Sequence, residues 1–276
     1  MKKNQTPLVS VVVTTRNEEK NIGACLDSVL NQAYPHRNIE TIVVDNKSTD
    51  QTVQIAKKKA TVYTHGNERS EQRNFGARKS HGLFYLYLDA DMHLDKDVII
   101  QCVNVLEKDR SVVAAYIPEI IVGTGYWSSV RRFERSFYNG TIIDCVRFVR
   151  MSAFVKVKGF DTTMTGPEDW DFDKKIRSVG KTVVIKAPLY HNEANFSIWN
   201  YFKKKKYYAR SFDRYTKKWG SEDDDIKKQF SLYYRFAGVF LENGKWRSTI
   251  KKPHLFLGIL FLRFLVGLSY LLRKMS

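Results

Sequence analysis

Residues 83–91 read Leu-Phe-Tyr-Leu-Tyr-Leu-Asp-Ala-Asp, an apolar run that ends in two carboxylates. The run predicts a buried strand over 83–88. If the strand continues through Asp91, Asp89 and Asp91 point to one face, because side chains alternate along a strand. Two carboxylates on one face repel each other unless a cation lies between them, and Mg²⁺ or Mn²⁺ suits oxygen ligands while leaving positions for substrate phosphates. This motif is short, but its position at a strand end favours a metal site.

The segments before this run alternate between strands and helices. Apolar patterns predict strands at 8–15, 39–44 and 61–64, and helices at 21–33, 49–59 and 68–79. Ser48 or Thr49 is expected to cap the second helix. Continuous apolar strands that alternate with helices predict an α/β fold with a mostly parallel sheet and helices on both faces.

Polar residues follow three of these strands, where ligands bind in such sheets. The segments are Thr-Arg-Asn-Glu at 15–18, Asp-Asn at 45–46 and Asp-Ala-Asp at 89–91. Polar clusters at three strand ends therefore indicate one binding site. The sequence has no G-x-G-x-x-G opening the first helix and no G-x-x-x-x-G-K-[ST], which disfavours a dinucleotide-dependent dehydrogenase and a P-loop enzyme.

A second acidic cluster lies at 166–171 and reads Gly-Pro-Glu-Asp-Trp-Asp. It opens a predicted helix that continues through Val179 and ends near Gly180. Acidic residues at a helix N-terminus also stabilise the helix dipole. That role explains Glu168 and Asp171 without catalysis, but it explains three acids in four positions less well.

Together these segments resemble the inverting family-2 glycosyltransferases, which have the GT-A fold, over about residues 8–192. Five motifs carry the resemblance, in the order of that family: Val11–Glu19 (entry strand and Asn-Glu loop), Val44–Asp50 (V-D-[ND]-x-S-x-D), Arg73–Ala77 (R-N-x-G), Asp89–Asp91 (metal motif) and Glu168–Asp171 (E-D-x-D). The resemblance implies a GT-A sheet that binds a nucleoside-diphosphate sugar.

The resemblance also implies which residues bind the donor. Thr15, Arg16 and Glu18 would line the nucleotide pocket, and Asp45 would bind the base or ribose. Arg73 would lie near the nucleotide or sugar, and Asp89 would contact the donor sugar or ribose. Asp91 would ligate Mn²⁺ or Mg²⁺. His191 would be a second metal ligand, which would favour Mn²⁺, although a lone histidine is often structural.

For the acceptor, the resemblance implies that Asp169 is the general base. A carboxylate there would take the proton of the acceptor hydroxyl as it attacks the anomeric carbon. A single displacement inverts that carbon, and the cation stabilises the departing diphosphate. Glu168, Trp170 and Arg150 are candidates for acceptor binding or support of the base.

The chain carries 46 Lys+Arg against 29 Asp+Glu, a net charge of +17. This charge predicts an acidic partner: nucleic acid, anionic lipid or a phosphorylated substrate. Basic and aromatic residues concentrate at 199–218 and precede an apolar run at 254–272. The arrangement favours an anionic membrane surface, and no nucleic-acid partner is expected because no motif for one accompanies the charge.

The apolar run at 254–272 has about the length that crosses a hydrocarbon core. Arg263 lies in its middle and is costly if it faces lipid. The run is therefore expected to lie in the interface, to re-enter, or to pair Arg263 with a partner. The alternative is a buried C-terminal helix beside a solvated basic face.

We predict a catalytic domain over 1–195, with a nucleotide-sugar half at about 1–92 and an acceptor half at about 93–195. Residues 196–276 are expected to form basic, aromatic amphipathic helices and a hydrophobic membrane anchor. Three separated cysteines (Cys25, Cys102 and Cys145) disfavour a disulfide scaffold and a zinc ribbon and fit a reducing cytosol. No signal peptide is visible at 1–7.

The expected function is metal-dependent, inverting sugar transfer at the cytoplasmic face of the cell membrane. No Q-x-x-R-W segment follows the base motif, and the nearest such stretch is 205–210, so we expect addition of one or a few sugars. The acceptor is expected to be a saccharide or a lipid-linked one such as a polyprenyl phosphate. Acceptor phosphates have five candidate partners, although a solvated helix face explains the first three equally well: Arg131, Arg132, Arg135, Arg147 and Arg150.

Two alternatives remain at this point. A sugar-nucleotide pyrophosphorylase would need a Gly-rich loop after the first strand, and residues 14–18 (Thr-Thr-Arg-Asn-Glu) are not one. A non-catalytic, peripheral membrane-binding protein would not need Asp89, Asp91 and Asp169.

Overall fold

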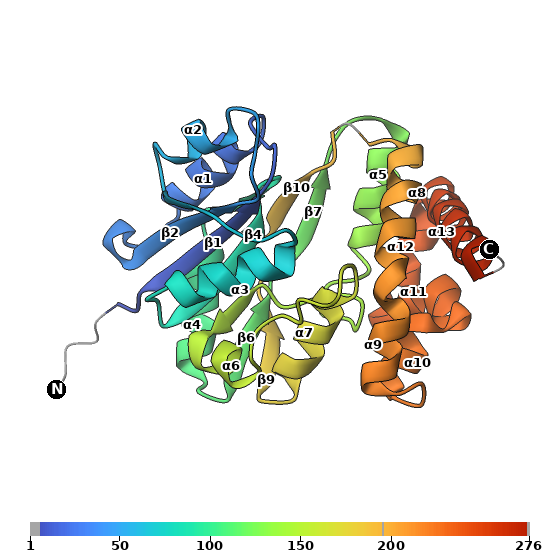
Figure 1. Cartoon of the computed structure of the whole chain (residues 1–276). Helices are drawn as coiled ribbons and strands as arrows, with labels where there is room; N and C mark the ends of the chain where they lie inside the picture. Colours follow the sequence, from blue (N-terminus) through green and yellow to red (C-terminus); the bar gives the residue numbers. More distant parts are fainter. Residues whose placement is uncertain (1–5, 195, 275–276) are drawn as a thin grey trace.

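The computed structural model describes residues 6–194 and 196–274, and its centre is a seven-stranded sheet of order β3-β2-β1-β4-β8-β6-β9 (Figure 1). Residues 1–5, part of the segment 1–7 discussed above, lie outside the described residues. A second sheet has the order β5-β10-β7. The strands are β1 (Val9–Thr15), β2 (Ile39–Asp45), β3 (Thr61–Thr64), β4 (Phe84–Asp89), β5 (Met92–Leu94), β6 (Val112–Tyr116), β7 (Glu119–Val122), β8 (Phe148–Arg150), β9 (Lys181–Val184) and β10 (Leu189–Asn192).

The strand pairs of the central sheet are parallel except at β8, which runs antiparallel to β4 and β6. The α-helices are α1 (Ile22–Leu30), α2 (Thr52–Ala56), α3 (Arg69–Lys79), α4 (Val98–Lys108), α5 (Gly125–Arg135), α6 (Met151–Lys156), α7 (Glu168–Arg177), α8 (Ile198–Tyr208), α9 (Phe212–Trp219), α10 (Asp224–Phe230), α11 (Val239–Leu241), α12 (Trp246–Lys251) and α13 (Pro253–Lys274). Short 3₁₀ turns (His36–Asn38, Ala209–Ser211, Glu242–Gly244) and a π-turn (Tyr234–Gly238) complete the described elements. This mixed, mostly parallel sheet is consistent with the expected GT-A fold.

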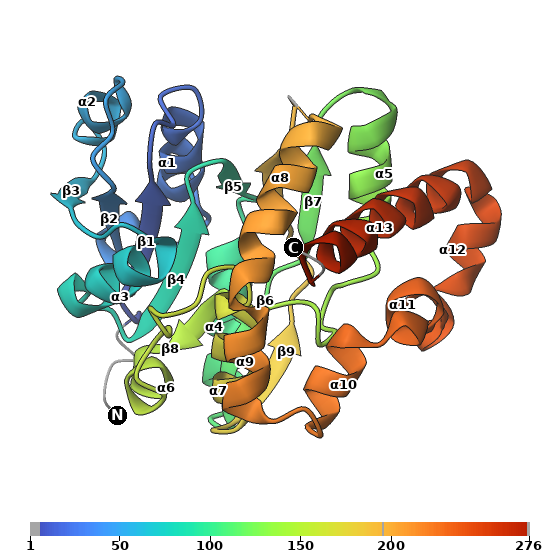
Figure 2. The same cartoon turned by 45° about the vertical axis from the view of Figure 1, so that its right-hand side comes forward.

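Alternate residues of β1 belong to two cores, one on each face of the sheet. Val9, Val11 and Val13 pack with buried residues of α1, α2 and α4, whereas Val12 packs with α3, α6 and α7. Helices therefore cover both faces, as predicted (Figure 2). Gly76 allows α3 to approach β1 closely, because a Cβ at this position would collide with the side chain of Val12.

The C-terminal helices form a further layer beside α5. Leu255, Ile259 and Leu262 of α13 pack against buried apolar residues of α5 and of the segment after it. Arg263 is also buried there: its Nε donates to Glu134 Oε1 at 3.1 Å and its Nη2 to Tyr138 Oη at 2.7 Å. The structure thus contains the pairing expected for Arg263. Among the described residues, no helix is both long and apolar enough to cross a membrane.

Most predicted elements of the first half are confirmed, and the differences lie at helix ends. The second helix runs only over Thr52–Ala56, and its N-cap is Gln51, without a side-chain cap. The prediction of Ser48 or Thr49 as the N-cap is wrong, because these residues hold the neighbouring loop instead.

Candidate active site

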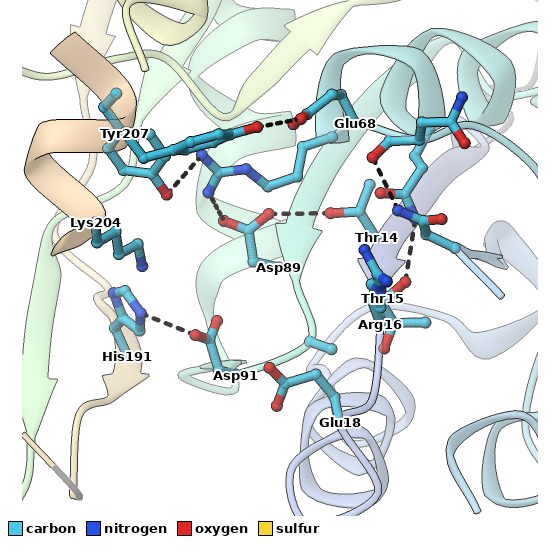
Figure 3. A pocket seen from close by; sticks show the side chains of 16 residues that line it. Thr14, Thr15, Arg16, Glu18, Glu68, Asp89, Asp91, His191, Lys204 and Tyr207 are labelled. Atoms are coloured by element: carbon cyan, nitrogen blue, oxygen red, sulfur yellow. Dashed lines mark hydrogen bonds and ion pairs between the residues drawn. The ribbon is translucent and has the colours of Figure 1, made fainter. Parts of the chain in front are cut away.

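A pocket of about 370 Å³ opens at the carboxyl ends of β1 and β4 (Figure 3). It combines residues of β1, the loops after β1, β2 and β3, α3, the turn after β4, β10 and α8. The residues that line it are Thr14, Thr15, Arg16, Glu18, Asn46, Asn67, Glu68, Arg69, Gln72, Asp89, Ala90, Asp91, His191, Lys204, Tyr207 and Tyr208. Predicted donor residues Thr15, Arg16, Glu18 and Asp89 are therefore brought together, with predicted metal ligands Asp91 and His191.

The loops after β1 and β2, which contribute Arg16, Glu18 and Asn46 to the pocket lining, are joined by hydrogen bonds. Asn17 N donates to Ser48 Oγ at 2.8 Å, and Asn17 Oδ1 accepts from Thr49 N at 2.8 Å. Asn17 and Lys47 both have a positive φ, of 54° and 51°, a conformation that asparagine tolerates better than most residues. The motif residues thus shape the loops that present Arg16 and Glu18.

Asp45 does not line the pocket, although it was predicted to bind the base or ribose. Its carboxylate accepts from Ser48 N at 2.9 Å and from Ser48 Oγ at 2.5 Å, and the residue is 1% exposed. The next residue, Asn46, lines the pocket instead. The structure therefore gives Asp45 a role in holding the turn.

Arg73 joins the two acidic motifs, Asp89–Asp91 and Glu168–Asp171. Its Nη2 donates to Asp89 Oδ1 at 3.0 Å and its Nη1 to Asp169 Oδ1 at 2.7 Å. Asp89 and Asp169 thus meet on one guanidinium although they lie on β4 and α7. Arg73 itself is fully buried and does not line the pocket, so it lies under the site and holds Asp89, which does line it.

The surroundings of Arg73 keep this bridge charged. Its guanidinium lies 4.6 Å from the ring centre of Tyr87 and 5.1 Å from that of Phe160. Burial alone would lower the pKa of Arg73, but Asp169 and Asp89 raise it well above its usual value. Burial would likewise raise the pKa of Asp89, but Arg73 and Arg69 hold it far below its usual range. Both partners are therefore ionised at neutral pH.

Asp91 and His191 meet because β10 pairs with β5, with His191 opposite Met92. His191 Nε2 lies 3.2 Å from Asp91 Oδ2, and its Nδ1 lies 2.8 Å from Glu119 Oε1. The strand does not continue through Asp91 as predicted: β4 ends at Asp89, the chain turns, and β5 begins at Met92. The turn directs Asp91 toward His191 and Glu18 (Figure 3).

The carboxylate of Asp91 and Nε2 of His191 are atoms that could bind a divalent cation. Asp91 Oδ1 is buried and has no hydrogen-bond partner in the described part of the chain. Burial would lower the pKa of His191, but its contacts with Asp91 and Glu119 raise it to about 10. Binding of a metal to the imidazole would require loss of that proton. No cluster of three or more His, Cys, Asp or Glu side chains suited to a metal is found within residues 6–194 and 196–274. A cation here would rest on Asp91, His191 and substrate phosphates.

Glu119 is a site residue that the sequence reasoning missed. It is buried on β7, contacts His191 Nδ1, and lies 3.2 Å from Arg135 Nε. Such a carboxylate fixes which nitrogen of a histidine faces the metal position. Its only signal in the sequence is one acidic residue at the start of an apolar strand.

Arg69 was also missed, one helical turn before Arg73 on α3. Its Nη2 donates to Glu168 Oε1 at 3.0 Å and to Tyr208 Oη at 3.1 Å, and its Nη1 lies 3.7 Å from Asp89 Oδ2. Burial and the neighbouring Asp169 raise the pKa of Glu168 despite this arginine. Glu168 therefore contacts the site through Arg69, in line with the supporting role considered for it. Arg69 could have been found from the sequence because it lies four residues before Arg73, on the same face of the helix.

The structure does not bring Trp170 or Arg150 to the pocket. Trp170 Nε1 donates to Ile143 O at 3.0 Å, and its ring stacks on Phe212 of α9. Arg150 pairs with Phe84 at the opposite end of β4, where its Nε donates to Val112 O at 3.0 Å and its Nη2 to Leu106 O. Trp170 thus joins α7 to α9 outside the pocket, and the structure places Arg150 at neither of its candidate roles, acceptor binding or support of Asp169.

The other candidate arginines are also used inside the protein. Arg131 pairs with Glu134 and Glu193, and Arg135 pairs with Asp144 and Glu119. Arg147 lies 3.6 Å from Glu119, and Arg132 donates to Ile121 O. These internal contacts occupy Arg131, Arg135 and Arg147, whereas Arg132 is exposed, as the solvated-face alternative expects.

Helix α8 closes one side of the pocket, although its basic and aromatic residues were read as membrane-facing. Tyr207 Oη donates to Glu68 Oε1 at 2.5 Å, and Tyr208 accepts from Arg69. Lys204 lies on the same side of the pocket as His191 (Figure 3). Gly166, with φ of 106°, lies so close to α8 that an added Cβ would be 2.6 Å from Tyr208 Cβ.

Comparisons with known proteins add to this geometry. A family model described as Glycosyl transferase family 2 matches residues 10–157. The poly(ribitol-phosphate) beta-N-acetylglucosaminyltransferase TarS of Staphylococcus aureus (strain MW2) is 27% identical over 177 residues, which are 61% of this chain and 30% of that protein. A dolichyl N-acetyl-alpha-D-glucosaminyl phosphate 3-beta-D-2,3-diacetamido-2,3-dideoxy-beta-D-glucuronosyltransferase of Methanococcus voltae is 25% identical over 199 residues, 60% of each chain. The chain thus spans less than two thirds of either relative.

Solved structures show the fold over nearly the whole chain. The mannosyltransferase PcManGT from Pyrobaculum calidifontis, in complex with GDP-Man and Mn²⁺, superposes with a TM-score of 0.66. The match covers 98% of this chain and 89% of that one at 18% sequence identity. The likeness shows a shared fold that includes the C-terminal helices.

Proposed function

Since the chain belongs to glycosyl transferase family 2, we propose that it moves a sugar from a nucleoside-diphosphate sugar to an acceptor hydroxyl, with inversion at the anomeric carbon. The observation that carries this proposal is the Arg73 bridge, which holds Asp89 and Asp169 at one edge of the sheet. A donor bound along Asp89 would then present its anomeric carbon near Asp169. Because the chain belongs to this family, we no longer consider a sugar-nucleotide pyrophosphorylase.

Asp169 is suited to accept the proton of the acceptor hydroxyl. Arg73 contacts Oδ1 of Asp169. The side chain of Asp169 is 26% exposed, so an incoming hydroxyl can reach the carboxylate. Fixing the carboxylate on a buried guanidinium orients it before the acceptor arrives. Arg69 lies 3.7 Å from Asp89 and adds a second positive charge beside the two carboxylates that Arg73 bridges.

Asp91 and His191 would hold a divalent cation, with Glu119 orienting the imidazole. When bound, the cation would stabilise the charge that develops on the departing diphosphate. The unpaired Oδ1 of Asp91 supports this assignment. The side chains of Arg16, Arg69 and Lys204 add positive charge around the same pocket and would attract the phosphates.

The acceptor in this proposal is a lipid-linked saccharide or a polyprenyl phosphate, at the cytoplasmic face of the cell membrane. The name of the Methanococcus voltae relative describes transfer to a dolichyl phosphate-linked sugar. The excess of basic residues in this chain also fits an anionic, membrane-bound acceptor. We propose addition of one or a few sugars.

Donor binding in the presence of Mn²⁺ tests the proposal. We expect one nucleoside-diphosphate sugar in a panel to raise the melting temperature, because a ligand that binds the native state stabilises it by mass action. Asp91→Ala should lose the part of this affinity that depends on Mn²⁺. Calorimetry of the identified donor with and without Mn²⁺ measures this, and an unchanged affinity in Asp91→Ala would contradict the ligand assignment.

Lys204 is expected to bind the donor phosphates from α8. Since a hydrogen bond to a charged group is worth about 1.5–3 kcal/mol, Lys204→Gln should lower kcat/KM by at least about tenfold. Lys203→Gln is the matched control, because Lys203 is the preceding residue of α8 but does not line the pocket. Equal losses in the two variants would show a general charge effect and remove Lys204 from the site.

A further inference from the structure

We propose that α13 lies in the plane of an anionic membrane surface and docks the protein through the outward face formed by Leu257, Phe261, Phe264 and Leu268, here called the docking face. This proposal goes beyond the membrane location proposed above, because it names the helix, its face and its orientation. It does not depend on the transfer reaction.

Helix α13 is apolar on two faces, and the protein covers only one of them. Leu255, Ile259 and Leu262 are buried against α5. The docking face repeats at intervals of four, three and four residues, so its members share the other side of the helix. These side chains are 65%, 48%, 60% and 40% exposed, in the order Leu257, Phe261, Phe264 and Leu268. A continuous exposed apolar stripe on a helix marks an interaction surface.

Arg263 fixes which face of α13 points outward. It is buried and donates to Glu134 and Tyr138, and its guanidinium lies 4.5 Å from the ring centre of Phe240. Rotation of the helix about its axis would break these contacts and leave Glu134 without one of its cations in the interior. Breaking a buried ion pair in this way costs a large amount of free energy. The docking face is therefore held toward the outside.

The ion pair of Arg263 with Glu134 favours an α13 that lies in the membrane interface over one that crosses the bilayer. Crossing would require α13 to leave α5 and to carry Arg263 into the hydrocarbon core, where an unpaired arginine is strongly disfavoured. In the interfacial arrangement Arg263 stays with Glu134, and only the docking face enters the acyl region. Amphipathic helices bind membranes in this way.

Charge selects the occupant of the docking face. The stretch 243–276 contains no Asp or Glu. Arg247, Lys251 and Lys252 are exposed next to α13, and Trp246 and Ile250 add exposed apolar side chains on α12. An anionic headgroup layer pairs with such cations and receives such apolar groups. A second copy of the chain would bring like charges together, which disfavours a dimer at this face.

Co-sedimentation with vesicles, without donor or acceptor, tests the proposal. We expect binding to phosphatidylcholine vesicles that contain phosphatidylglycerol. Phe261→Ser/Phe264→Ser should lower the partition coefficient by at least about tenfold, because two exposed phenyl groups no longer enter the acyl region. Lys251→Gln/Lys252→Gln should lower binding to the anionic vesicles and not to pure phosphatidylcholine. Val155→Ser on α6, which is 66% exposed, is the matched control and should bind like the wild type.

Nitroxide labels on Leu257→Cys and Leu268→Cys test the orientation. The two labels should report equal, shallow depths if α13 lies in the interface, and clearly different depths if it crosses the bilayer. Undiminished binding of Phe261→Ser/Phe264→Ser, or unequal label depths, would overturn the proposal. A dimer in sedimentation velocity that this double variant dissociates would overturn it as well. The three natural cysteines are buried and should not react with the label.

Vesicle binding and donor binding are measured separately, so their failures can be told apart. A protein that binds vesicles but no nucleotide sugar would contradict the proposed transfer and leave the docking face intact. A protein that binds a donor but no vesicles would contradict the docking face and leave the proposed transfer intact.

Discussion

Asp169→Asn is expected to lower kcat by about 10²–10⁴-fold, the usual contribution of a general base. The amide has nearly the shape of the carboxylate and its oxygen can still accept from Arg73, so the bridge to Asp89 is largely kept. It cannot accept the proton of the acceptor hydroxyl. Donor affinity should therefore stay close to that of the wild type. Steady-state rates at saturating donor, together with calorimetry of donor binding, measure the two effects.

Glu168→Gln is the control for this experiment. It removes a neighbouring carboxylate at the start of the same helix, where Glu168 contacts Arg69 and accepts from Gly166 N. We expect it to affect stability or KM more than the proton-transfer step. A rate for Asp169→Asn above about a tenth of the wild-type value would exclude Asp169 as the base, since general bases contribute more than this.

The second large effect is expected on stability. Arg73→Met should destabilise the fold by about 3–5 kcal/mol, because it removes the cation that pairs with the partly buried carboxylate of Asp169 and leaves Asp89 with the more distant Arg69. Equilibrium unfolding in urea measures this change. Arg73→Lys keeps the charge but cannot bridge two carboxylates in the same geometry, so its loss should be smaller.

The loss in Arg73→Met should also depend on pH. Burial opposes ionisation of Asp89, but Arg73 and Arg69 lower its pKa in the folded protein. A lowered pKa stabilises the fold above the unfolded value of about 3.9 and loses this effect as the pH falls further. The difference between wild type and variant should therefore be largest near neutral pH and shrink in acid. A difference that is constant with pH would show that packing of the arginine, and not its charge, is what matters.

The sequence predicted the parallel core because each strand there carries its own apolar pattern. β1, β2, β3 and β4 were found within one or two residues, and the ligand-binding edge followed from their order. The pairing of Arg73 with Asp169 was not predictable in the same way. It joins residues 96 positions apart, and its geometry depends on how α7 packs on the sheet.

Long-range packing also explains why the turn at Asp91 and the contacts of α8 with the pocket were not predicted. A strand pattern cannot reveal that the chain turns after Asp89, because the turn is held by pairing of β5 with β10. The basic residues of α8 look alike in sequence, but only Lys204 of the run 203–206 lines the pocket. Arg263 was identified as requiring a partner, whereas the identity of Glu134 needed the packing of α13 on α5.

Gly166 places a limit on how this protein can be recombined with its relatives. Its Cα lies against Tyr208, so the loop before the base helix and the end of α8 fit each other as a matched pair. A chimaera that imports another enzyme's α8 would need to import residues 164–167 with it. Residues 164–167 and α8 are distant in sequence, but in an engineered chimaera they should be exchanged together.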